Sequence, residues 1–183
     1  MPPYDPARLH RRTVRLQGYD YRQAGAYFIT LCTHQRESVF GAIGADAMQP
    51  NAHGQIVAED WEWLALRYPY VSLDAFVVMP NHLHGIILMT DPVGAIAPGG
   101  QSPSPEPPVR QARKPLGGLI GAFKTVSTKH VNEWREAPGA MLWQRNYYEH
   151  IVRNKSDLQR IRDYIAANPA RWPDDAENPA TFL

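Results

Sequence analysis

Cysteine is almost absent from this sequence of 183 residues, in which Cys32 stands alone. A single thiol cannot form a disulfide within the chain, which excludes the disulfide-rich secreted scaffolds and fits a reducing cytoplasm. Long apolar runs are absent too, since none approaches the roughly 20 residues of a membrane span. Residues 1–15 are polar and lack the apolar core of a secretory signal. The sequence therefore predicts a cytoplasmic protein with no membrane partner.

A strong net charge is also missing, because the formal value is only +1 at pH 7. The basic residues are nevertheless concentrated in two parts of the chain: Arg8, Arg11, Arg12 and Arg15 near the start, and Arg110, Arg113, Lys114, Lys124 and Lys129 later. Basic segments of this kind can neutralise phosphates, which is the dominant contribution to nucleic-acid affinity. A solvated basic tail fits the same pattern, so charge alone leaves both interpretations open.

The chain has the length of one domain, and its hydrophobic pattern alternates between strand and helix periods. The predicted elements are strands at 26–33, 73–79 and 82–89, helices at 55–68, 115–134 and 156–168, and a short extended segment within 141–151. Ser156 and Gln159 are spaced as a capping box at the start of the last helix, and Pro169 ends that helix near residue 168.

This order of elements predicts the α+β fold class: an antiparallel sheet with helices packed on it, of the split βαβ type found in ferredoxin-like and RRM-like domains. The segment 92–114 is dense in Pro, Gly, Ser and Gln, and we interpret it as a flexible insertion. The predicted organisation is a basic arm at 1–24, a single domain at 25–172 that contains the insertion, and a C-terminal tail at 173–183.

Two histidines are the first candidates for chemistry. His82 and His84 are two residues apart on a predicted strand, so both side chains lie on one face while Leu83 points to the opposite, buried face. Neutral imidazoles placed in this way can bind one divalent cation. A pair of half-buried histidines without a ligand gives the same pattern, so the motif alone is weak.

The last helix carries a second set of candidates beside an apolar stripe of Leu158, Ile161 and Ile165. Tyr164 and Asn168 are one turn apart and share a face of the helix. A tyrosine in this position can present its hydroxyl to a site, and the asparagine can offer a carbonyl oxygen to a metal. A boundary tyrosine and an asparagine that caps the helix also fit the pattern.

Taken together, five blocks in a fixed order resemble the REP-associated tyrosine transposases, which belong to the single-tyrosine HUH transposases. The blocks are YFITLCT (27–33), VMPNHLH (78–84), FKT (123–125), LWQRNYYEH (142–150) and DYI followed by NP (163–169). The resemblance extends from about residue 15 to residue 172, and the insertion at 92–114 departs from a compact core of this family.

The resemblance implies roles for particular residues. It makes His82 and His84 ligands of a catalytic Mg²⁺ or Mn²⁺, with Asn168 completing the metal site, and it makes Tyr164 the nucleophile. Tyr147 and Tyr148 are the second choice for the nucleophile.

The resemblance also implies a function: a transposase that binds hairpin-forming repetitive extragenic palindromic DNA, as a cytoplasmic, nucleoid-associated monomer or homodimer. Such an enzyme cleaves and rejoins single-stranded DNA through a 5′-phosphotyrosine. The residues expected to contact DNA are Arg11, Arg12, Arg15, Lys124, Trp143, Arg145, Tyr147 and Tyr148. The aromatic members of this group offer faces on which bases can stack.

Two other functions fit parts of the pattern. A domain of the same fold could bind structured DNA or RNA without cutting it, although the tyrosine and both histidines are present. A metal-dependent phosphoesterase that uses water is the other alternative. The scarcity of carboxylates near His82 and His84 in the sequence argues against it, because two-metal hydrolases usually bring Asp or Glu.

Overall fold

The computed structural model describes residue 16 and residues 18–91 and 113–182. The strands are β1 (Gly25–Cys32), β2 (Gly41–Gly44), β3 (Ala47–Pro50), β4 (Val71–Val78), β5 (His82–Met89) and β6 (Tyr148–Val152). The helices are α1 (Ala52–Arg67), α2 (Leu116–Trp134) and α3 (Lys155–Ala167), with short 3-10 turns η2 (His34–Arg36), η3 (Pro169–Asp174) and η4 (Pro179–Phe182). Within the described ranges, none of the helices has both the length and the apolar character needed to cross a bilayer.

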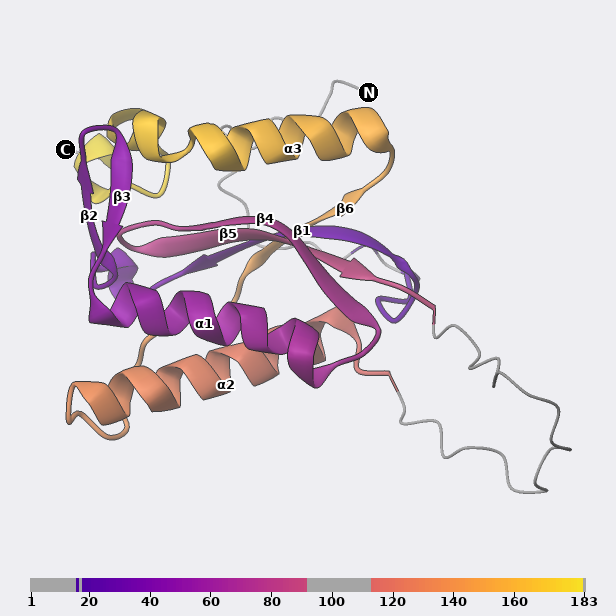
Figure 1. Ribbon diagram of the computed structural model, residues 1–183, viewed down its shortest axis with the longest axis horizontal. Coiled ribbons are helices and arrows are strands. Elements are labelled where there is room, and N and C mark those ends of the chain that lie inside the picture. Colours follow the sequence, from indigo (N-terminus) through magenta and orange to yellow (C-terminus); the bar gives the residue numbers. More distant parts are fainter. Residues whose placement is uncertain (1–15, 17, 92–112, 183) are drawn as a thin grey trace, which may run out of the picture.

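The central sheet has four strands in the order β4-β5-β1-β6, and every neighbouring pair is antiparallel. Because β1 and β4 are both antiparallel to β5, they run parallel to each other on either side of it, which is the split βαβ arrangement. Helices α1 and α2 cover one face of the sheet and α3 covers the other (Figure 1). The predicted α+β fold, an antiparallel sheet with helices packed on it, is therefore confirmed.

The main core lies between the sheet and the pair α1 and α2. Alternate residues of β1, including Tyr27, Ile29 and Leu31, point into it, as the two-residue period of a strand requires. Gly85 on β5 allows a close approach here, because a Cβ at this position would lie 2.5 Å from Cζ2 of Trp61 on α1. Larger residues at position 85 would therefore separate α1 from the sheet.

A smaller core lies on the α3 face. Phe28 and Ile86 project from the sheet and pack against Ile161 and Ile165 of the helix. These two isoleucines belong to the apolar stripe that the sequence predicts. The cluster, which also includes side chains of β4, packs α3 against the sheet, and so it sets which helix positions face the site.

Two helix starts differ from the predicted ones because asparagine side chains cap them. The side chain of Asn51 accepts a hydrogen bond from the Gly54 amide, and α1 begins at Ala52 rather than at 55. The side chain of Asn154 accepts from the Asp157 amide at 2.8 Å, and α3 begins at Lys155. The capping box expected at Ser156 is therefore wrong, because a residue upstream already satisfies the free amide.

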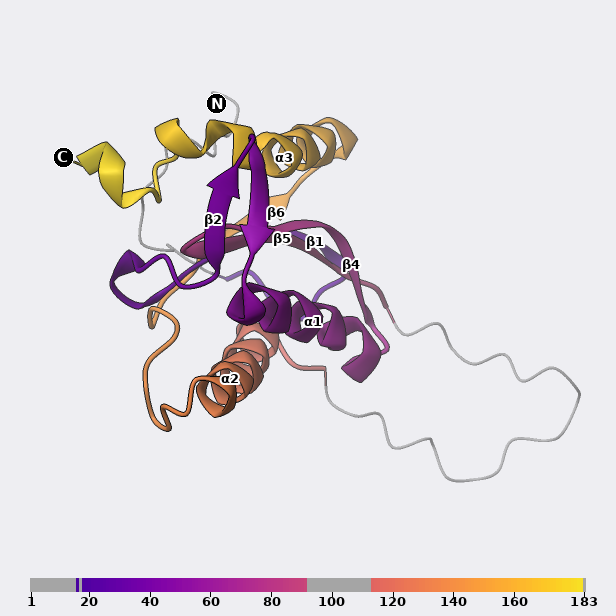
Figure 2. The same cartoon turned by 60° about the vertical axis from the view of Figure 1, so that its left-hand side comes forward.

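The hairpin β2–β3 was not predicted. Its turn residues Ala45 and Asp46 have φ values of 49° and 60°. Hairpin turns with this backbone usually carry Asn or Gly, and the Ala-Asp pair at 45–46 lacks that turn signal. The hairpin lies beside η3 at the C-terminal end of α3 in both orientations of the ribbon (Figure 2).

The described residues on the two sides of the predicted insertion meet in space. The Arg113 guanidinium forms an ion pair of 3.0 Å with Asp91 and donates a hydrogen bond of 2.8 Å to the Thr90 carbonyl. Residues 92–112, which make up most of the predicted insertion, lie outside the described residues. The two ends of this segment are thus held together at the edge of the domain.

Candidate active site

The two histidines of β5 lie side by side on the α3 face of the sheet. The ring centroids of His82 and His84 are 4.5 Å apart, and both side chains are buried. Leu83 between them belongs to the main core on the opposite face. The structure therefore gives both histidines the common face that their spacing predicts.

Each histidine has an oxygen beside its Nδ1 atom. Nδ1 of His82 lies 2.8 Å from Oδ1 of Asn81, and Nδ1 of His84 lies 2.9 Å from Oγ1 of Thr30 on β1. Phe28 stacks on the His84 ring with centroids 5.4 Å apart. These contacts hold both rings so that their Nε2 atoms are left for other partners.

Burial favours the neutral form of both imidazoles. Desolvation lowers the pKa of His82, although the nearby carboxylates of Asp175 and Glu177 act in the opposite direction. Desolvation and the neighbouring His82 hold the pKa of His84 well below its ordinary value. Neutral rings are the form of histidine that binds metals.

Helix α3 brings Tyr164 and Asn168 to the histidines. The Tyr164 hydroxyl lies 3.2 Å from Nε2 of His84, and the two ring centroids are 5.2 Å apart. One turn later, the buried Asn168 lies beside His82 and donates a hydrogen bond of 2.8 Å to Oδ2 of Asp175. The one-turn spacing thus brings both residues to the same site.

Asp175 was not predicted as a site residue. It is buried in the segment after η3, and its carboxylate, with the ring nitrogens of His82 and His84, supplies ligand atoms that all lie within 4.8 Å of one another. Asp175 falls in the segment that the sequence treats as a tail, where no periodic pattern links it to the sheet. The nearest motif in the sequence is the Asn-Pro pair at 168–169, and it did not indicate a role for Asp175.

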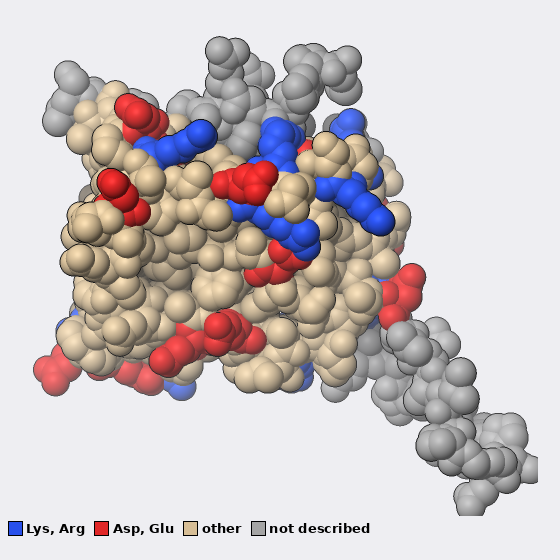
Figure 3. All heavy atoms as spheres, turned by 45° about the horizontal axis from the view of Figure 1, so that its top comes forward, with Lys and Arg blue, Asp and Glu red and all other residues tan. Residues whose placement is uncertain are grey.

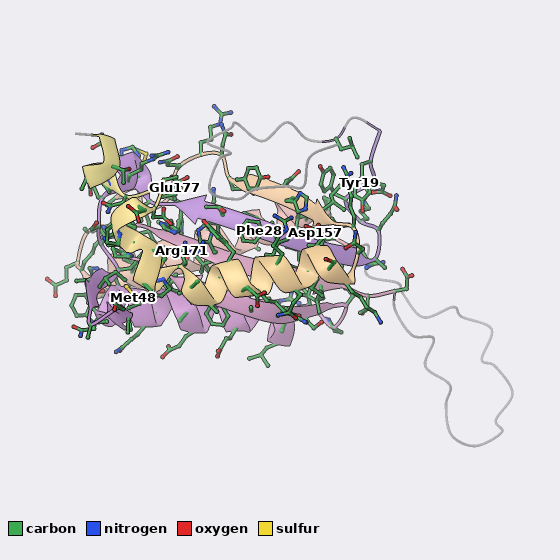
Figure 4. All side chains as sticks on the ribbon, turned by 90° about the horizontal axis from the view of Figure 1, so that it is seen from above. Tyr19, Phe28, Met48, Asp157, Arg171 and Glu177 are labelled. Carbon is green, nitrogen blue, oxygen red and sulfur yellow. The ribbon has the colours of Figure 1, made fainter. Side chains whose placement is uncertain are left out.

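Several contacts hold the segment that carries Asp175. Glu177 forms an ion pair of 3.0 Å with Arg36, and its carboxylate accepts a hydrogen bond from the Cys32 thiol. The backbone carbonyl of Glu177 accepts from the Asn81 amide at 2.7 Å. Figure 4 shows Glu177 at the end of the sheet where β1 ends, and Phe28 beneath α3. The segment therefore closes one end of the site.

The donor atoms fit a divalent cation. Among the described residues, Nε2 of His82 and Oδ1 of Asn168 are both buried without a hydrogen-bond partner. Because these two atoms lie in the same site as the ligand atoms of His84 and Asp175, a cation bound among them would pair both. Imidazole nitrogen and carboxylate or amide oxygen suit Mg²⁺ and Mn²⁺ as well as other divalent metals.

Trp143 is a correction to the predicted DNA contacts. Only 7% of its surface is exposed, and its indole N–H donates a hydrogen bond of 2.9 Å to Ser127 on α2. Its ring packs against Phe40 and Phe123. A side chain enclosed in the main core cannot stack on bases, so the aromatic character of the block around residue 143 misled the prediction.

Lys124 also differs from the prediction. Its ammonium group donates to the backbone carbonyls of Gln144, Arg145 and Asn146 at 2.8, 3.4 and 3.0 Å. The group is thus committed to holding the segment before β6 rather than free for a phosphate. Burial lowers the pKa of Lys124 to about 8.

The remaining predicted contact residues lie in different settings. Arg145 is exposed, whereas Tyr147 and Tyr148 are half-buried. Tyr148 lies on β6 opposite Thr30 and packs edge-on against Phe28. This places Tyr148 next to the site but on the sheet rather than on α3. Arg11, Arg12 and Arg15 lie outside the described residues.

Charged side chains gather on the α3 side of the molecule, where Lys and Arg are interspersed with Asp and Glu (Figure 3). Two of the basic residues are paired, with Arg160 bound to Asp157 and Arg162 bound to Asp74 on β4. Arg153 and Lys155 at the start of the helix are exposed. The cations on this face are thus partly neutralised by neighbouring carboxylates.

Comparisons with known proteins agree with this architecture. No protein-family model matches the chain. An uncharacterised protein of Haemophilus influenzae is 38% identical over 173 residues, which cover 94% of this chain and 95% of that protein. Among solved structures, a REP-associated tyrosine transposase bound to a REP hairpin superposes with a TM-score of 0.57 at 18% identity, covering 87% of this chain and 74% of the other. The chain therefore belongs to one family with the Haemophilus influenzae protein, and its fold is that of the REP-associated tyrosine transposase that the sequence blocks resemble.

Proposed function

We propose that this protein is a metal-dependent transposase that cleaves and rejoins single-stranded DNA through a covalent 5′-phosphotyrosine. One observation carries the proposal: the Tyr164 hydroxyl lies 3.2 Å from a buried histidine of a site with two unpaired acceptor atoms. A tyrosine that only lay at the boundary between core and solvent would not need its hydroxyl beside a candidate metal site. The shared fold with a REP-associated tyrosine transposase supports the same function.

Four side chains would hold the cation: His82 and His84 through nitrogen, and Asn168 and Asp175 through oxygen. Mg²⁺ and Mn²⁺ are the ions we expect. When bound, the cation would polarise the scissile phosphate and neutralise negative charge that develops during attack. Asp175 adds a negative charge that the set inferred from sequence lacked, and this favours a divalent ion.

Tyr164 would act as the nucleophile. Its oxygen attacks the phosphorus, the bond from phosphorus to the 3′-oxygen breaks, and the phenol proton is lost while the departing 3′-oxygen gains one. The 5′-phosphotyrosine keeps the energy of the phosphodiester, so attack by another 3′-hydroxyl rejoins DNA without ATP. The half-buried position of Tyr164 leaves part of the side chain accessible to a strand.

The DNA would be a single strand beside a hairpin, because the solved transposase of this fold is bound to a REP hairpin. Of the predicted contacts, Arg145 is exposed and Tyr148 is half-buried beside the site, whereas half-buried Tyr147 packs against the main core on the opposite face of the sheet. The arginines at 11, 12 and 15 would neutralise phosphates. Such a protein would work in the cytoplasm at the nucleoid, as a monomer or a homodimer.

A phosphoesterase that uses water instead of tyrosine is the second candidate. The sequence argued against it because carboxylates were scarce near the histidines, and the buried Asp175 removes that objection. The two functions differ in one product, since only the tyrosine mechanism leaves protein joined to DNA.

The deciding experiment incubates the full chain with an end-labelled single-stranded hairpin substrate and Mn²⁺ or Mg²⁺. We expect a labelled protein band that survives denaturation and disappears when EDTA is added. Cleaved DNA without a protein adduct would establish the phosphoesterase, and binding without cleavage would establish a non-cleaving module of the same fold.

A further inference from the structure

Asn81, at the turn between β4 and β5, makes three polar contacts that fix the orientation of its amide. The residue is fully buried, and its Nδ2 atom lies 3.1 Å from the Arg36 carbonyl oxygen and 2.7 Å from that of Glu177. Carbonyl oxygens can only accept hydrogen bonds. The side-chain atom that faces both must therefore be the NH₂ group, whichever way the amide is first drawn.

This orientation determines where His82 carries its hydrogen. The other end of the Asn81 amide, Oδ1, lies 2.8 Å from Nδ1 of His82 and can only accept. Nδ1 must then hold the hydrogen, because two lone pairs at this distance would repel each other. In a neutral ring the lone pair consequently lies on Nε2, which is buried and lacks a partner among the described residues.

We propose that Asn81 is a positioning residue that holds His82 in the Nδ1–H tautomer and aims its Nε2 lone pair into the metal site. The inference rests on the proposed function for the identity of that site. Ligating histidines commonly donate their second nitrogen to a fixed oxygen, which sets the ring orientation and raises ligand basicity. Asn81 also binds the Glu177 carbonyl, two residues from Asp175, and so joins two ligands of the site.

His84 provides a comparison within the same protein. Its Nδ1 faces the Thr30 hydroxyl, which can either donate or accept. Thr30 therefore does not impose a tautomer, whereas Asn81 does. A change at residue 81 should alter the ring of His82 and leave that of His84 as it was.

The test uses long-range ¹H–¹⁵N correlation spectra of the imidazoles in the metal-free full chain, with Mn²⁺ affinity measured separately by calorimetry. In the wild type, His82 should show the Nδ1–H form alone. Asn81→Ala should give a mixture of tautomers at His82 and weaken Mn²⁺ binding by about 10- to 100-fold.

Asn132→Ala is the matched control, because Asn132 is another buried asparagine whose amide donates to a backbone carbonyl, that of Ala140, on the far side of the sheet. It should leave both measurements unchanged. A wild-type His82 protonated on Nε2, or an Asn81→Ala protein with an unchanged spectrum and affinity, would overturn the inference. If the wild type binds no Mn²⁺, the proposed metal site fails, and the spectra still decide the role of Asn81.

Discussion

Replacing Tyr164 with phenylalanine removes one oxygen and separates the chemistry of the site from its packing. The hydroxyl contacts Nε2 of His84 at 3.2 Å, and a hydrogen bond of this kind contributes about 1 kcal/mol to stability. The ring would keep its edge contacts with Phe28 and His84. For a chain of this size, the loss corresponds to a decrease in Tm of roughly 2–4 °C.

The same hydrogen bond makes a prediction about metal affinity. The Tyr164 hydroxyl is hydrogen-bonded to Nε2 of His84, and this is the nitrogen through which His84 would bind the cation. The hydrogen bond contributes about 1 kcal/mol, so its removal should tighten Mn²⁺ binding by up to roughly fivefold. The covalent DNA adduct should be abolished, and hairpin binding should stay within about twofold because no phosphate contact is lost.

Three measurements on the purified variant check this reasoning: adduct formation on a denaturing gel, Mn²⁺ titration by calorimetry, and hairpin binding by fluorescence anisotropy. Tyr148→Phe is the control, because Tyr148 lies next to the same cluster on β6 and should keep at least part of the activity. An active Tyr164→Phe protein with an inactive Tyr148→Phe protein would assign the nucleophile to Tyr148. A Tyr164→Phe protein that binds metal much more weakly would show that the hydroxyl supports the site rather than competing for it.

The other predictions concern charge. Asp175→Asn should reduce Mn²⁺ affinity by about tenfold or more while keeping the fold, and unchanged calorimetry would remove Asp175 from the ligand set. Lys124 has a pKa of about 8 in the folded chain and an ordinary value of 10.5, so the folded state binds fewer protons between these values. Its contribution should therefore make the free energy of unfolding rise with pH from about 8 to 10, and denaturant titrations should show a smaller rise for Lys124→Met. Replacing Arg11, Arg12 and Arg15 with Ala should weaken hairpin binding and reduce its log–log salt slope by roughly 0.7 for each lost phosphate contact, and an unchanged slope would exclude the arm from DNA binding.

Local geometry explains what the sequence by itself determined. The shared face of His82 and His84 follows from the two-residue period of a strand, and the common position of Tyr164 and Asn168 follows from the helical turn. The split βαβ type needed only the succession of elements along the chain, whereas the position of β6 beside β1 was not predicted. The two shared faces depend on residues close together in the sequence, and the split βαβ type depends on the order of the elements.

Tertiary packing decided the rest, because burial and pairing join residues far apart in the chain. Asp175 lies at the histidines because its segment is held against the end of the sheet, where Glu177 contacts Arg36, Cys32 and Asn81. Trp143 occupies the core since α2 encloses it, although an exposed stacking tryptophan would have the same sequence context. These tertiary contacts decide whether a polar side chain binds DNA, a metal or another part of the chain. The periodicity of the sequence carries no information about such contacts.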